Sequence, residues 1–371
     1  MYIKNLFLDN FRNYGREEFE FSPGVNVLYG NNAQGKTNCV EAVFYLCTGY
    51  SPRARKEKQF IRYGEEKSKI KAVAQTRAGL VSAEANFYNG EDKVILVNGT
   101  EIKKIGEILG NINAVYFNPS ELKLVTEAPE DRRRFIDISV SQIKRSYFYG
   151  LQRYKKIIAQ RNNLLKNDNK ELINATLAIW DTQLVPICAR IISDRNDFLS
   201  RLAPKAKEVH AYLTDGAEEL EVGFDHSYTG SEKEIAEAFL ADLTERREKD
   251  MELGYTSIGP HRDDLKLAIN GKEVKTYASQ GQMRTTALSL KVAETEIFKE
   301  RYGESPVLVL DDALSELDKK RQKKLLERIN GVQTIITCTD VDEEVIGTVD
   351  STRFLIDGGK LIEKRQFEKR V

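Results

Sequence analysis

An apolar run at residues 27–29 leads directly into a segment of the form G-x-x-x-x-G-K-T, which predicts a strand, a phosphate-binding loop and a helix. Gly30 and Gly35 permit backbone angles that a side chain would forbid, so successive N–H groups can turn toward phosphate oxygens. We expect the helix over about residues 36–47, with Gly49 as its stop, and its N-terminal dipole would favour the same phosphates. The motif therefore predicts a nucleotide-binding protein.

A second motif supplies the metal side of this nucleotide site. Lys36 can reach the β- and γ-phosphates of ATP, and the Thr37 hydroxyl can bind Mg²⁺. Four apolar residues at 307–310 precede Asp311 and Asp312, as in a buried strand that delivers acids to the carboxyl edge of a sheet. Asp311 would then hold Mg²⁺ through water, and Asp312 would polarise the attacking water as general base. The structural alternative is a core strand that ends in surface acids.

A third segment opens a helix that we expect over about residues 283–298, and we call it the signature segment: Ser279, Gln280, Gly281 and Gln282. A helix start with Ser and Gly is an anion site, although it is a weak signal alone. It lies 32 residues before Asp311, where an ABC-type ATPase keeps its signature helix. In such proteins this helix caps the γ-phosphate bound by the other subunit. Hydrolysis then needs two chains that enclose two ATP molecules.

Composition limits the class of protein. The 371 residues predict two or three lobes, and 57 basic against 57 acidic residues give no global charge that would attract nucleic acid. Any attraction must come from a local patch. No apolar segment reads as long enough to cross a bilayer, and the N-terminus lacks a signal-peptide core, so we expect a cytoplasmic protein without a membrane. Four scattered cysteines without C-x-x-C spacing argue against zinc and for reduced thiols.

The order of patterns predicts an α/β fold: an ABC-type P-loop ATPase head whose mixed-sheet core is built from both chain ends, with an inserted, largely helical lobe. Short strands are indicated at residues 3–11, 17–21 and 70–102, helices at 132–206, buried parallel strands at 307–310 and 334–337, and a terminal hairpin at 354–362. We place the core lobe at residues 1–138 and 300–371. The helical lobe at residues 139–299 would carry the signature segment.

The chain resembles the RecF family of bacterial recombination proteins, which are relatives of the SMC heads. The resemblance covers nearly the whole chain. The matching motifs lie at residues 11–14, 30–38, 51–53, 117–122, 129–137 and 259–264. In this family the basic residue of the first motif, here Arg12, lies near the nucleotide, and Arg53 matches an arginine that reaches it. The ATP-binding residues implied are Gly30, Asn31, Asn32, Ala33, Gln34, Gly35, Lys36, Thr37, Asn38, Arg12 and Arg53.

The resemblance implies an ATP-dependent homodimer that binds DNA and favours gapped DNA or junctions between single and double strands. With RecR and RecO partners, such a protein helps to load recombinase on single-stranded DNA. ATP hydrolysis, with ATP and Mg²⁺ as cofactors, would act as a switch. A weak ATPase stimulated by DNA is therefore expected.

Departures from transporter-type ATPases predict slow turnover. Those proteins place Gln in the loop that senses Mg²⁺, whereas the matching segment here offers the shorter Asn118 as metal ligand. They place Glu after the metal-binding Asp, whereas this chain has Asp312, and residues 337–340 contain no His. A shorter base and a missing His both weaken the positioning of water, as suits a timed clamp.

One segment could contact DNA. Residues 144–166 are expected to be helical and carry seven basic residues, no acidic residue and several aromatic side chains. Such a face could follow phosphates without regard to sequence. The candidate contacts are Lys144, Arg145, Lys155 and Lys156. The alternative is a solvated helix face that simply carries charge.

Two other functions stay open at the sequence level. A transporter-coupled ATPase subunit would need a switch His and a membrane partner, and the missing His argues against it. An ATP-gated DNA scaffold with vestigial hydrolysis is the other. Among the histidines, His261 in a Gly-Pro turn is expected to be a structural hydrogen bonder, whereas His210 and His226 carry no pattern and are expected at the surface.

Overall fold

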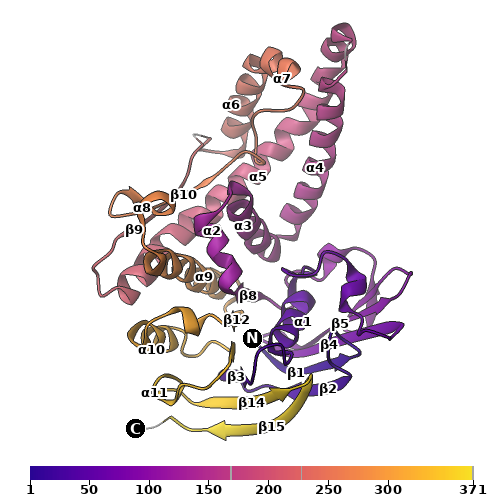
Figure 1. Cartoon of the computed structure of the whole chain (residues 1–371). Coiled ribbons are helices and arrows are strands. Elements are labelled where there is room, and N and C mark those ends of the chain that lie inside the picture. The colour runs from indigo at the N-terminus through magenta and orange to yellow at the C-terminus, as the bar shows by residue number, and fades with distance from the viewer. Residues whose placement is uncertain (168, 227, 370–371) are drawn as a thin grey trace.

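A mixed sheet built from both ends of the chain forms one layer of the molecule (Figure 1). The computed structural model describes residues 1–167, 169–226 and 228–369. The strand order of this sheet is β15-β14-β3-β13-β12-β8, parallel except for the final hairpin partner β15. Its strands are β3 (Val25–Tyr29), β8 (Ala114–Phe117), β12 (Val307–Asp311), β13 (Thr334–Cys338), β14 (Ser351–Asp357) and β15 (Lys360–Phe367).

An antiparallel sheet with the order β2-β1-β4-β5-β6-β7 forms the second layer. Helix α1 (Lys36–Thr48) contacts strands of both sheets and is buried along most of its length. The predicted helix and its stop are confirmed, because Gly49 closes α1 in the left-handed conformation. The strands are β1 (Tyr2–Asp9), β2 (Arg16–Glu20), β4 (Lys67–Thr76), β5 (Gly79–Tyr88), β6 (Val94–Val97) and β7 (Thr100–Ile102).

The register of the parallel strands places their carboxyl ends at one edge of the mixed sheet. Every residue of β12 is buried, which explains why its sequence is a continuous apolar run that ends in an acid. Asp311 pairs with Thr337 on β13, and Thr337 pairs with Leu28 on β3, just before the phosphate loop. The loop and the acids therefore meet at the carboxyl edge of the sheet.

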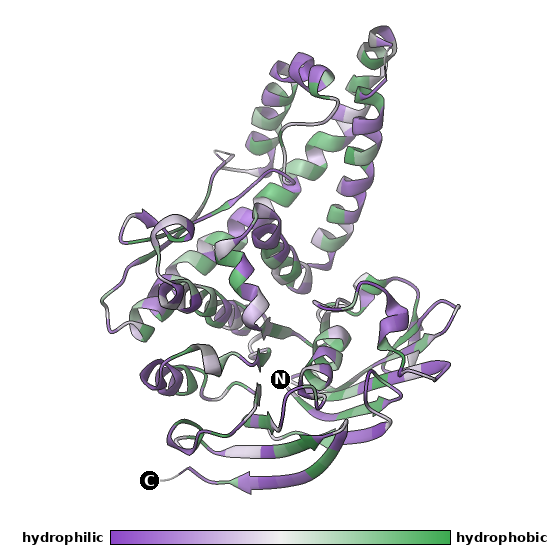
Figure 2. Cartoon of the chain, in the orientation of Figure 1, coloured by the Kyte–Doolittle hydropathy of each residue, from purple (hydrophilic) through white to green (hydrophobic). Residues whose placement is uncertain are grey.

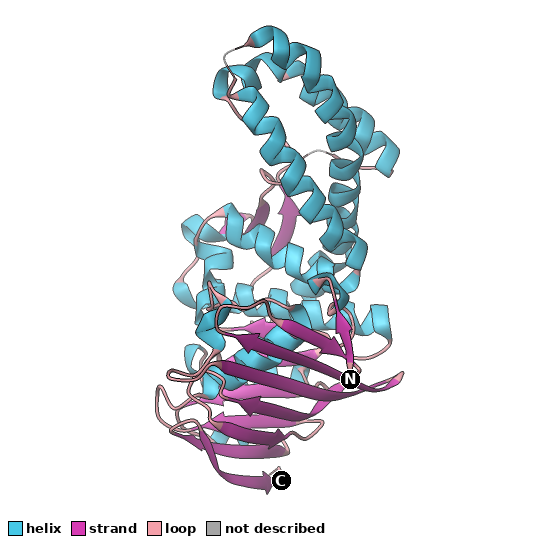
Figure 3. Ribbon diagram, turned by 90° about the vertical axis from the view of Figure 1, so that its right-hand side faces the viewer, coloured by secondary structure: helices cyan, strands magenta, loops and turns pink. Residues whose placement is uncertain are grey.

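The helical part projects from the sheets, and both termini lie on the sheet side (Figures 1 and 3). Its long helix α5 (Lys170–Leu213) packs against α4, α6 and α9. The other elements here are α2 (Lys123–Thr126), α3 (Pro129–Ile143), α4 (Arg145–Leu165), β9 (Leu220–Phe224), α6 (Glu232–Glu245), α7 (Arg247–Leu253), β10 (Leu265–Ile269), β11 (Lys272–Glu273), α8 (Val274–Tyr277) and α9 (Gln280–Tyr302). The inserted helical part that the sequence predicts is therefore confirmed.

Two short helices complete the sheet layer: α10 (Lys319–Arg328) and α11 (Glu343–Ile346). Figure 2 shows α10 as almost entirely hydrophilic, and it packs through its buried Leu325 and Leu326. The boundaries expected at residues 138 and 300 fall inside α3 and α9, so both helices bridge the two parts. We therefore keep the division into a core lobe at 1–138 and 300–371 and a helical lobe at 139–299 as a proposal.

One stretch of α5, Ala175–Leu213, is long and apolar enough to cross a membrane by length and composition, which differs from the sequence expectation. Its place in the fold explains the composition. The helix is the centre of the helical lobe, and its buried Asp181 and Arg195 make ion pairs within the protein. Such a pattern is typical of a core helix.

The expectation that His210 and His226 lie at the surface is wrong. His210 is fully buried between Ser289 and Glu218, at 3.2 and 3.0 Å from its two ring nitrogens. His226 is stacked on Phe224, and burial lowers the pKa of both histidines. Neither position has a periodic pattern, so the sequence alone offers no sign of this burial.

Candidate nucleotide site

The phosphate loop is held tightly between two neighbouring segments. Gly30 and Gly35 have φ angles of 139° and 121°, in the region that favours glycine. A Cβ atom at Gly30 would lie 2.3 Å from the carbonyl oxygen of Ile356 on β14. A Cβ atom at Gly35 would lie 2.8 Å from Nδ2 of Asn13. Glycine is therefore required at both motif positions by backbone conformation and by space.

Hydrogen bonds fasten the loop to the same two segments. The Asn13 amide donates to the Gln34 carbonyl at 2.9 Å, and the Tyr14 hydroxyl donates to the Gly35 carbonyl at 3.0 Å. From the terminal hairpin, the Gly359 N–H donates to the Gln34 carbonyl at 2.8 Å. The segment at residues 11–14 thus acts as a support for the loop.

Lys36 lies across the loop that it follows. Its Nζ donates to the carbonyl oxygens of Gly30 at 2.6 Å and Asn31 at 2.7 Å. Burial lowers the pKa of Lys36, although the nearby Asp312 and Asp311 favour its charged form. The ammonium therefore lies between the loop carbonyls and the acids, where phosphate oxygens would be expected to bind.

Thr37 and Asp311 meet as the metal motif predicts. The Thr37 hydroxyl donates to Oδ1 of Asp311 at 3.0 Å, and the Thr337 hydroxyl donates to the same oxygen at 2.6 Å. The Tyr116 hydroxyl donates to Oδ2 at 2.7 Å. A hydroxyl beside one carboxylate fits Mg²⁺, which keeps water and takes substrate phosphates as further ligands. Among the described residues no group of three or more His, Cys, Asp and Glu could hold a metal, so no protein-only metal cage is indicated.

Asn118 is held by hydrogen bonds to neighbouring residues. Its side-chain oxygen accepts from the Ser120 hydroxyl at 2.6 Å and from the Glu121 N–H at 3.1 Å, so it caps the short 3₁₀ helix Pro119–Leu122. Its amide nitrogen donates to the Tyr116 hydroxyl at 3.2 Å. These contacts give Asn118 a capping role in this structure, and its assignment as a metal ligand stays a prediction. Asn118 reaches Asp311 only through Tyr116.

Asp312 is exposed beside the phosphate loop, and its φ of 54° is unusual for a residue other than glycine. Its N–H donates to the Thr337 hydroxyl at 2.9 Å, and its Oδ1 accepts from the Ser315 hydroxyl at 3.1 Å. The turn that bends the chain after β12 therefore directs this carboxylate toward the cavity next to Lys36. Strained backbone of this kind is common at functional sites.

A cavity of about 340 Å³ brings most of the predicted residues together. It is lined by Asn32, Ala33, Gln34, Gly35, Lys36, Thr37, Asn38, Arg53, Asp312, Thr337 and Thr339. Thr337 and Thr339 were missed by the sequence interpretation, which saw in residues 337–340 only the lack of His. Their position just after a buried strand was the available signal.

Glu41 organises the two predicted arginines and was also missed. It is fully buried on α1, and its carboxylate accepts two hydrogen bonds from Arg12, at 2.9 and 2.7 Å. The Ser51 hydroxyl donates to it at 2.6 Å, and Nη1 of Arg53 lies 4.0 Å away. Arg53 also donates to the Asn38 side chain at 3.0 Å. A carboxylate within the apolar residues 39–47 was the signal.

In the signature segment Ser279 and Gln280 are exposed, and Gly281 and Gln282 are half-buried. None of the four is among the residues that line the cavity at the phosphate loop. Ser279 caps α9: its hydroxyl accepts from the Gln282 N–H at 3.3 Å, and the Gln282 side chain accepts from the Ser279 N–H at 2.8 Å. The predicted helix start is confirmed. Its exposure agrees with a role toward another subunit, which stays a prediction.

Helix α4 carries the predicted basic residues on more than one face. Arg161 is fully buried and paired with Asp181 and Asp250, each at 3.0 Å, so its expected place on a basic face is wrong. The aromatic Tyr147 and Tyr154 are also buried. Lys144 pairs with Asp194, and Arg145 donates to the Leu109 carbonyl at 2.6 Å. The other basic side chains on its exposed face are Arg153, Lys155 and Lys156.

His261 has both ring nitrogens engaged. Nδ1 contacts the Tyr154 hydroxyl, and Nε2 lies 3.1 Å from the Thr256 carbonyl. Burial lowers the pKa of His261 to about 4, so the ring is neutral near pH 7. This geometry agrees with the structural role expected for it.

Comparisons with known proteins identify the family of this chain. Residues 2–352 match the model of the RecF/RecN/SMC N terminal domain. The chain is 43% identical over 345 residues to the DNA replication and repair protein RecF of Acetivibrio thermocellus, covering 92% of this chain and 94% of that protein. It is 41% identical to RecF of Clostridium acetobutylicum, covering 98% of this chain and 100% of the relative.

Solved structures give the same result. The recombination mediator protein RecF with ATPγS bound, described as part of the RecFOR pathway, superposes with a TM-score of 0.87 at 36% identity, over 98% of both chains. An Smc head bound to a domain of ScpA has a TM-score of 0.60 at 16% identity, over 99% of this chain and 98% of that one, which shows a shared fold alone. The chain belongs to the RecF family.

Proposed function

We propose that this chain is an ATP-dependent DNA-binding protein of recombinational repair and replication, which dimerises on gapped or junction DNA and hydrolyses ATP slowly. One observation carries the proposal. Lys36, Thr37, Asp311 and Asp312 surround the phosphate loop, while the exposed start of the signature segment, Ser279 and Gln280, lies elsewhere on the same chain. Such a site has its phosphate-binding half and lacks the half that a second subunit would supply.

Each residue of the site would have its own role in ATP binding and hydrolysis. The N–H groups of residues 30–35 and the Lys36 ammonium would bind the β- and γ-phosphates. Thr37 and Asp311 would hold Mg²⁺, which neutralises phosphate charge when bound. Asp312 would take a proton from the attacking water, and Ser279 of a second copy would cap the γ-phosphate. A carboxylate one methylene shorter than Glu supports slow turnover.

Partners follow from the relatives. The similar structure of RecF is described as a mediator in the RecFOR pathway, so we propose RecO- and RecR-type proteins as partners of this chain, in the cytoplasm. DNA would lie along the exposed basic face of α4, which includes Lys155 and Lys156. Because the chain has no net charge, one face would bind weakly. ATP-driven dimerisation would place two faces on one DNA molecule and raise their effective concentration.

The test is the mass in solution with and without ATP and Mg²⁺. We expect the parent to form a dimer only when ATP and Mg²⁺ are both present. Ser279→Arg should stay a monomer, because the larger, charged arginine side chain would block the shared site. The matched control is Lys233→Arg on the exposed surface of α6, which should dimerise as the parent does. A Ser279→Arg variant that still dimerises with ATP would contradict the shared site.

A scaffold with vestigial hydrolysis is the competing function, and Asp312→Asn separates the two. The variant should bind ATP and dimerise but keep its DNA complex several times longer, because the base that starts hydrolysis is absent. The lifetime of the complex after a chase with unlabelled DNA measures this. An unchanged lifetime would favour the scaffold.

A further inference from the structure

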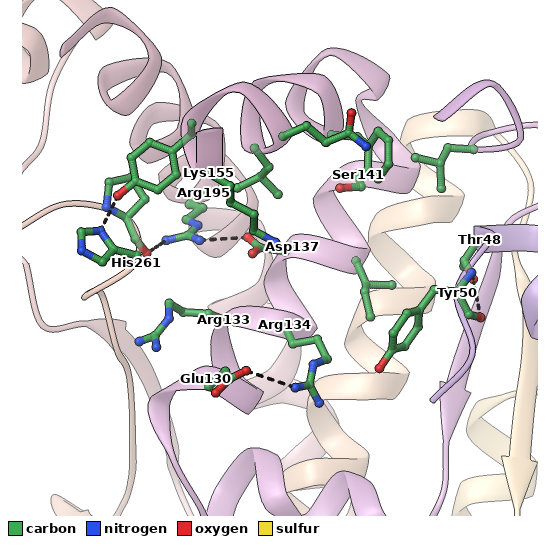
Figure 4. Close-up of a pocket in the computed structure, with 17 residues that line it drawn as sticks. Thr48, Tyr50, Glu130, Arg133, Arg134, Asp137, Ser141, Lys155, Arg195 and His261 are labelled. Atoms are coloured by element: carbon green, nitrogen blue, oxygen red, sulfur yellow. Dashed lines mark hydrogen bonds and ion pairs between the residues drawn. The ribbon is translucent and has the colours of Figure 1, made fainter. Parts of the chain in front are cut away.

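A second cavity of about 430 Å³ lies between the sheet layer and the helical part, and we call it the interlobe pocket (Figure 4). Thr48, the last residue of α1, and Tyr50, just after that helix, line it from the sheet side. Side chains of α3 and α4, together with Pro260 and His261, line the other sides. Its volume is in the range of pockets that hold a small molecule or one unit of a polymer. None of its lining residues lines the cavity at the phosphate loop.

Aromatic and apolar side chains provide most of the wall. Tyr50, Phe148 and Tyr154 contribute rings, and Leu109 and Leu151 contribute aliphatic surface. The uncharged polar side chains are those of Thr48, Ser141, Gln152 and His261, besides the hydroxyls of Tyr50 and Tyr154. Flat rings with a small number of hydrogen-bonding groups suit a planar heterocycle, since every nucleobase has a π-face that stacks on an aromatic ring.

The charged groups of the pocket leave an excess of positive charge. Arg195 is satisfied by Asp137 at 2.9 Å and Asp263 at 2.8 Å, so these three cancel one another in part. Arg133, however, is half-buried, and its one hydrogen bond within the described part of the chain is to the backbone carbonyl of Asp263, at 2.7 Å. Burial, with the nearby Arg195, lowers the pKa of Arg133, although Asp264, Asp263 and Asp137 favour its charged form.

Two more cations stand at this pocket, and only one of them is paired. Arg134 contacts Asp131 at 3.0 Å and Glu130 at 3.5 Å. Lys155 on α4 is exposed and has no ion-pair partner within residues 1–167, 169–226 and 228–369. An anion bound at the entrance would therefore meet Arg133 and Lys155.

We propose that the interlobe pocket holds one unpaired nucleobase of single-stranded DNA, stacked on Tyr50 or Phe148, with its adjoining phosphate against Arg133 and Lys155. The inference rests on the proposed DNA-binding function and deepens it. The favoured occupant is nucleic acid because Lys155 continues into the exposed basic face of α4, with Arg153 and Lys156. A duplex would have to lose a base pair to fill the pocket, whereas a single-stranded tail fills it without that cost.

This pocket also touches the segment that leads to the nucleotide site. The Tyr50 N–H donates to the Thr48 hydroxyl at 3.2 Å, and Ser51, the next residue, bonds to Glu41. Arg53 follows two residues later and lines the cavity at the phosphate loop. A base stacked on Tyr50 would therefore contact the chain that positions Arg53.

The experiment compares Lys155→Gln with Lys156→Gln, because both lysines are exposed neighbours on α4 and only Lys155 lines the pocket. Each variant is titrated, with ATP and Mg²⁺, against a blunt duplex and against the same duplex with a single-stranded tail. We expect both variants to bind the blunt duplex equally, slightly more weakly than the parent. Only Lys155→Gln should also lose about three- to fivefold of the preference for the tailed DNA.

Two further measurements identify the base itself. An abasic site moved along the tail should lower affinity about five- to tenfold at one position near the junction, since one stacked base is lost. A 2-aminopurine at that position should be quenched on binding, and Tyr50→Leu, which keeps bulk but removes the ring, should reduce the quenching. The control is Lys166→Gln, because Lys166 is exposed and lies outside the pocket lining, and this variant should quench as the parent does.

A flat abasic scan with unchanged 2-aminopurine fluorescence would overturn the proposal. If Lys155→Gln then weakened binding of an acidic peptide with an aromatic residue, the occupant would be a protein segment instead. Failure of the parent to bind even the blunt duplex with ATP would contradict the proposed DNA-binding function, which is a separate result. A position-dependent abasic effect that Tyr50→Leu abolishes would support the pocket.

Discussion

The nucleotide core and the helical part of this protein use charged side chains in opposite ways. In the core, Lys36 and Asp312 stand at the carboxyl edge of a sheet, beside a cavity. In the helical part, Arg161 and Arg195 are buried, and each is paired with two carboxylates. Charge in the core is available to a ligand, whereas buried charge in the helical part joins α4 and α5 to the chain that follows. The same residue type thus has a different role in each region.

Among variants that test this contrast, Asp250→Ala is expected to have the largest effect on stability. Asp250 is fully buried and holds Arg161 at 3.0 Å, and the Ser257 N–H also donates to it, at 2.9 Å. Its loss leaves a buried guanidinium with too few acceptors, so the free energy of unfolding should fall by about 3–5 kcal/mol. Urea unfolding of the whole chain, followed by circular dichroism, measures the change.

The control for this variant is an exposed ion pair of the same lobe. Arg201 on α5 contacts Asp197 at 3.1 Å, and both side chains are more than half exposed. Arg201→Gln should change the free energy of unfolding by less than about 0.5 kcal/mol. If the two variants were equally stable, burial would not be what distinguishes the arginines of the helical part.

The next effect is expected in the core, from Lys36→Ala. Among the described residues the ammonium hydrogen-bonds to loop carbonyls alone, so its removal should leave the free energy of unfolding nearly unchanged. Two lost charge-assisted hydrogen bonds to phosphate should weaken ATP binding about a hundredfold, or about 2.7 kcal/mol. Calorimetric titration with ATP and Mg²⁺ measures this. A variant that binds ATP normally would remove Lys36 from the site.

Sequence reasoning was strongest where function depends on residues that are neighbours along the chain. The phosphate loop, the acids after β12 and the start of α9 each lie in one short segment whose backbone geometry follows from Gly, a buried strand or a Ser cap. The buried parallel strands at residues 307–310 and 334–337 could be expected as well, because such strands have continuous apolar sequences, whereas their order in the sheet could not. The core was therefore predictable.

Residues that act through distant contacts could not be predicted in this way. Glu41 meets Arg12 across 29 positions, and Tyr116 meets Asp311 across 195. Arg161 looked like part of a basic face because its partners, which include Asp250, lie far away in the sequence. Local pattern cannot distinguish an exposed cation from one that distant carboxylates will bury.

Glu41→Gln is expected to have a smaller effect on stability and would sharpen the comparison. Glu41 lies in the core, yet its charge is buried and paired, as the charges of Arg161 and Arg195 are in the helical part. The amide offers one neutral acceptor where the carboxylate accepted from Arg12 and Ser51. The free energy of unfolding should fall by about 1–2 kcal/mol. ATP affinity should also fall, because Arg12 and Arg53 would be held less firmly. The fall should be smaller than for Lys36→Ala, because both arginines are still present.

The matched control is Glu65→Gln, which alters an exposed carboxylate that accepts from Asn10 at 3.1 Å. It should leave both stability and ATP affinity unchanged. The double variant of Arg12→Gln with Glu41→Gln should be less destabilised than the sum of the two single variants, because the pair is already broken. Additive losses would mean that Glu41 acts on the site without Arg12.

The smallest effect is expected on the exposed face of the helical part, where charge is again available to a ligand. Lys156→Gln removes one cation that DNA phosphates would attract, so affinity for duplex DNA should fall only a few-fold at moderate salt. The slope of log affinity against log salt should decrease by about one, which separates a phosphate contact from a change in fold. Lys233→Gln on α6, exposed and outside that face, should keep the parent slope. An unchanged slope for Lys156→Gln would assign its charge to solvation alone, and α4 would then resemble an ordinary surface helix.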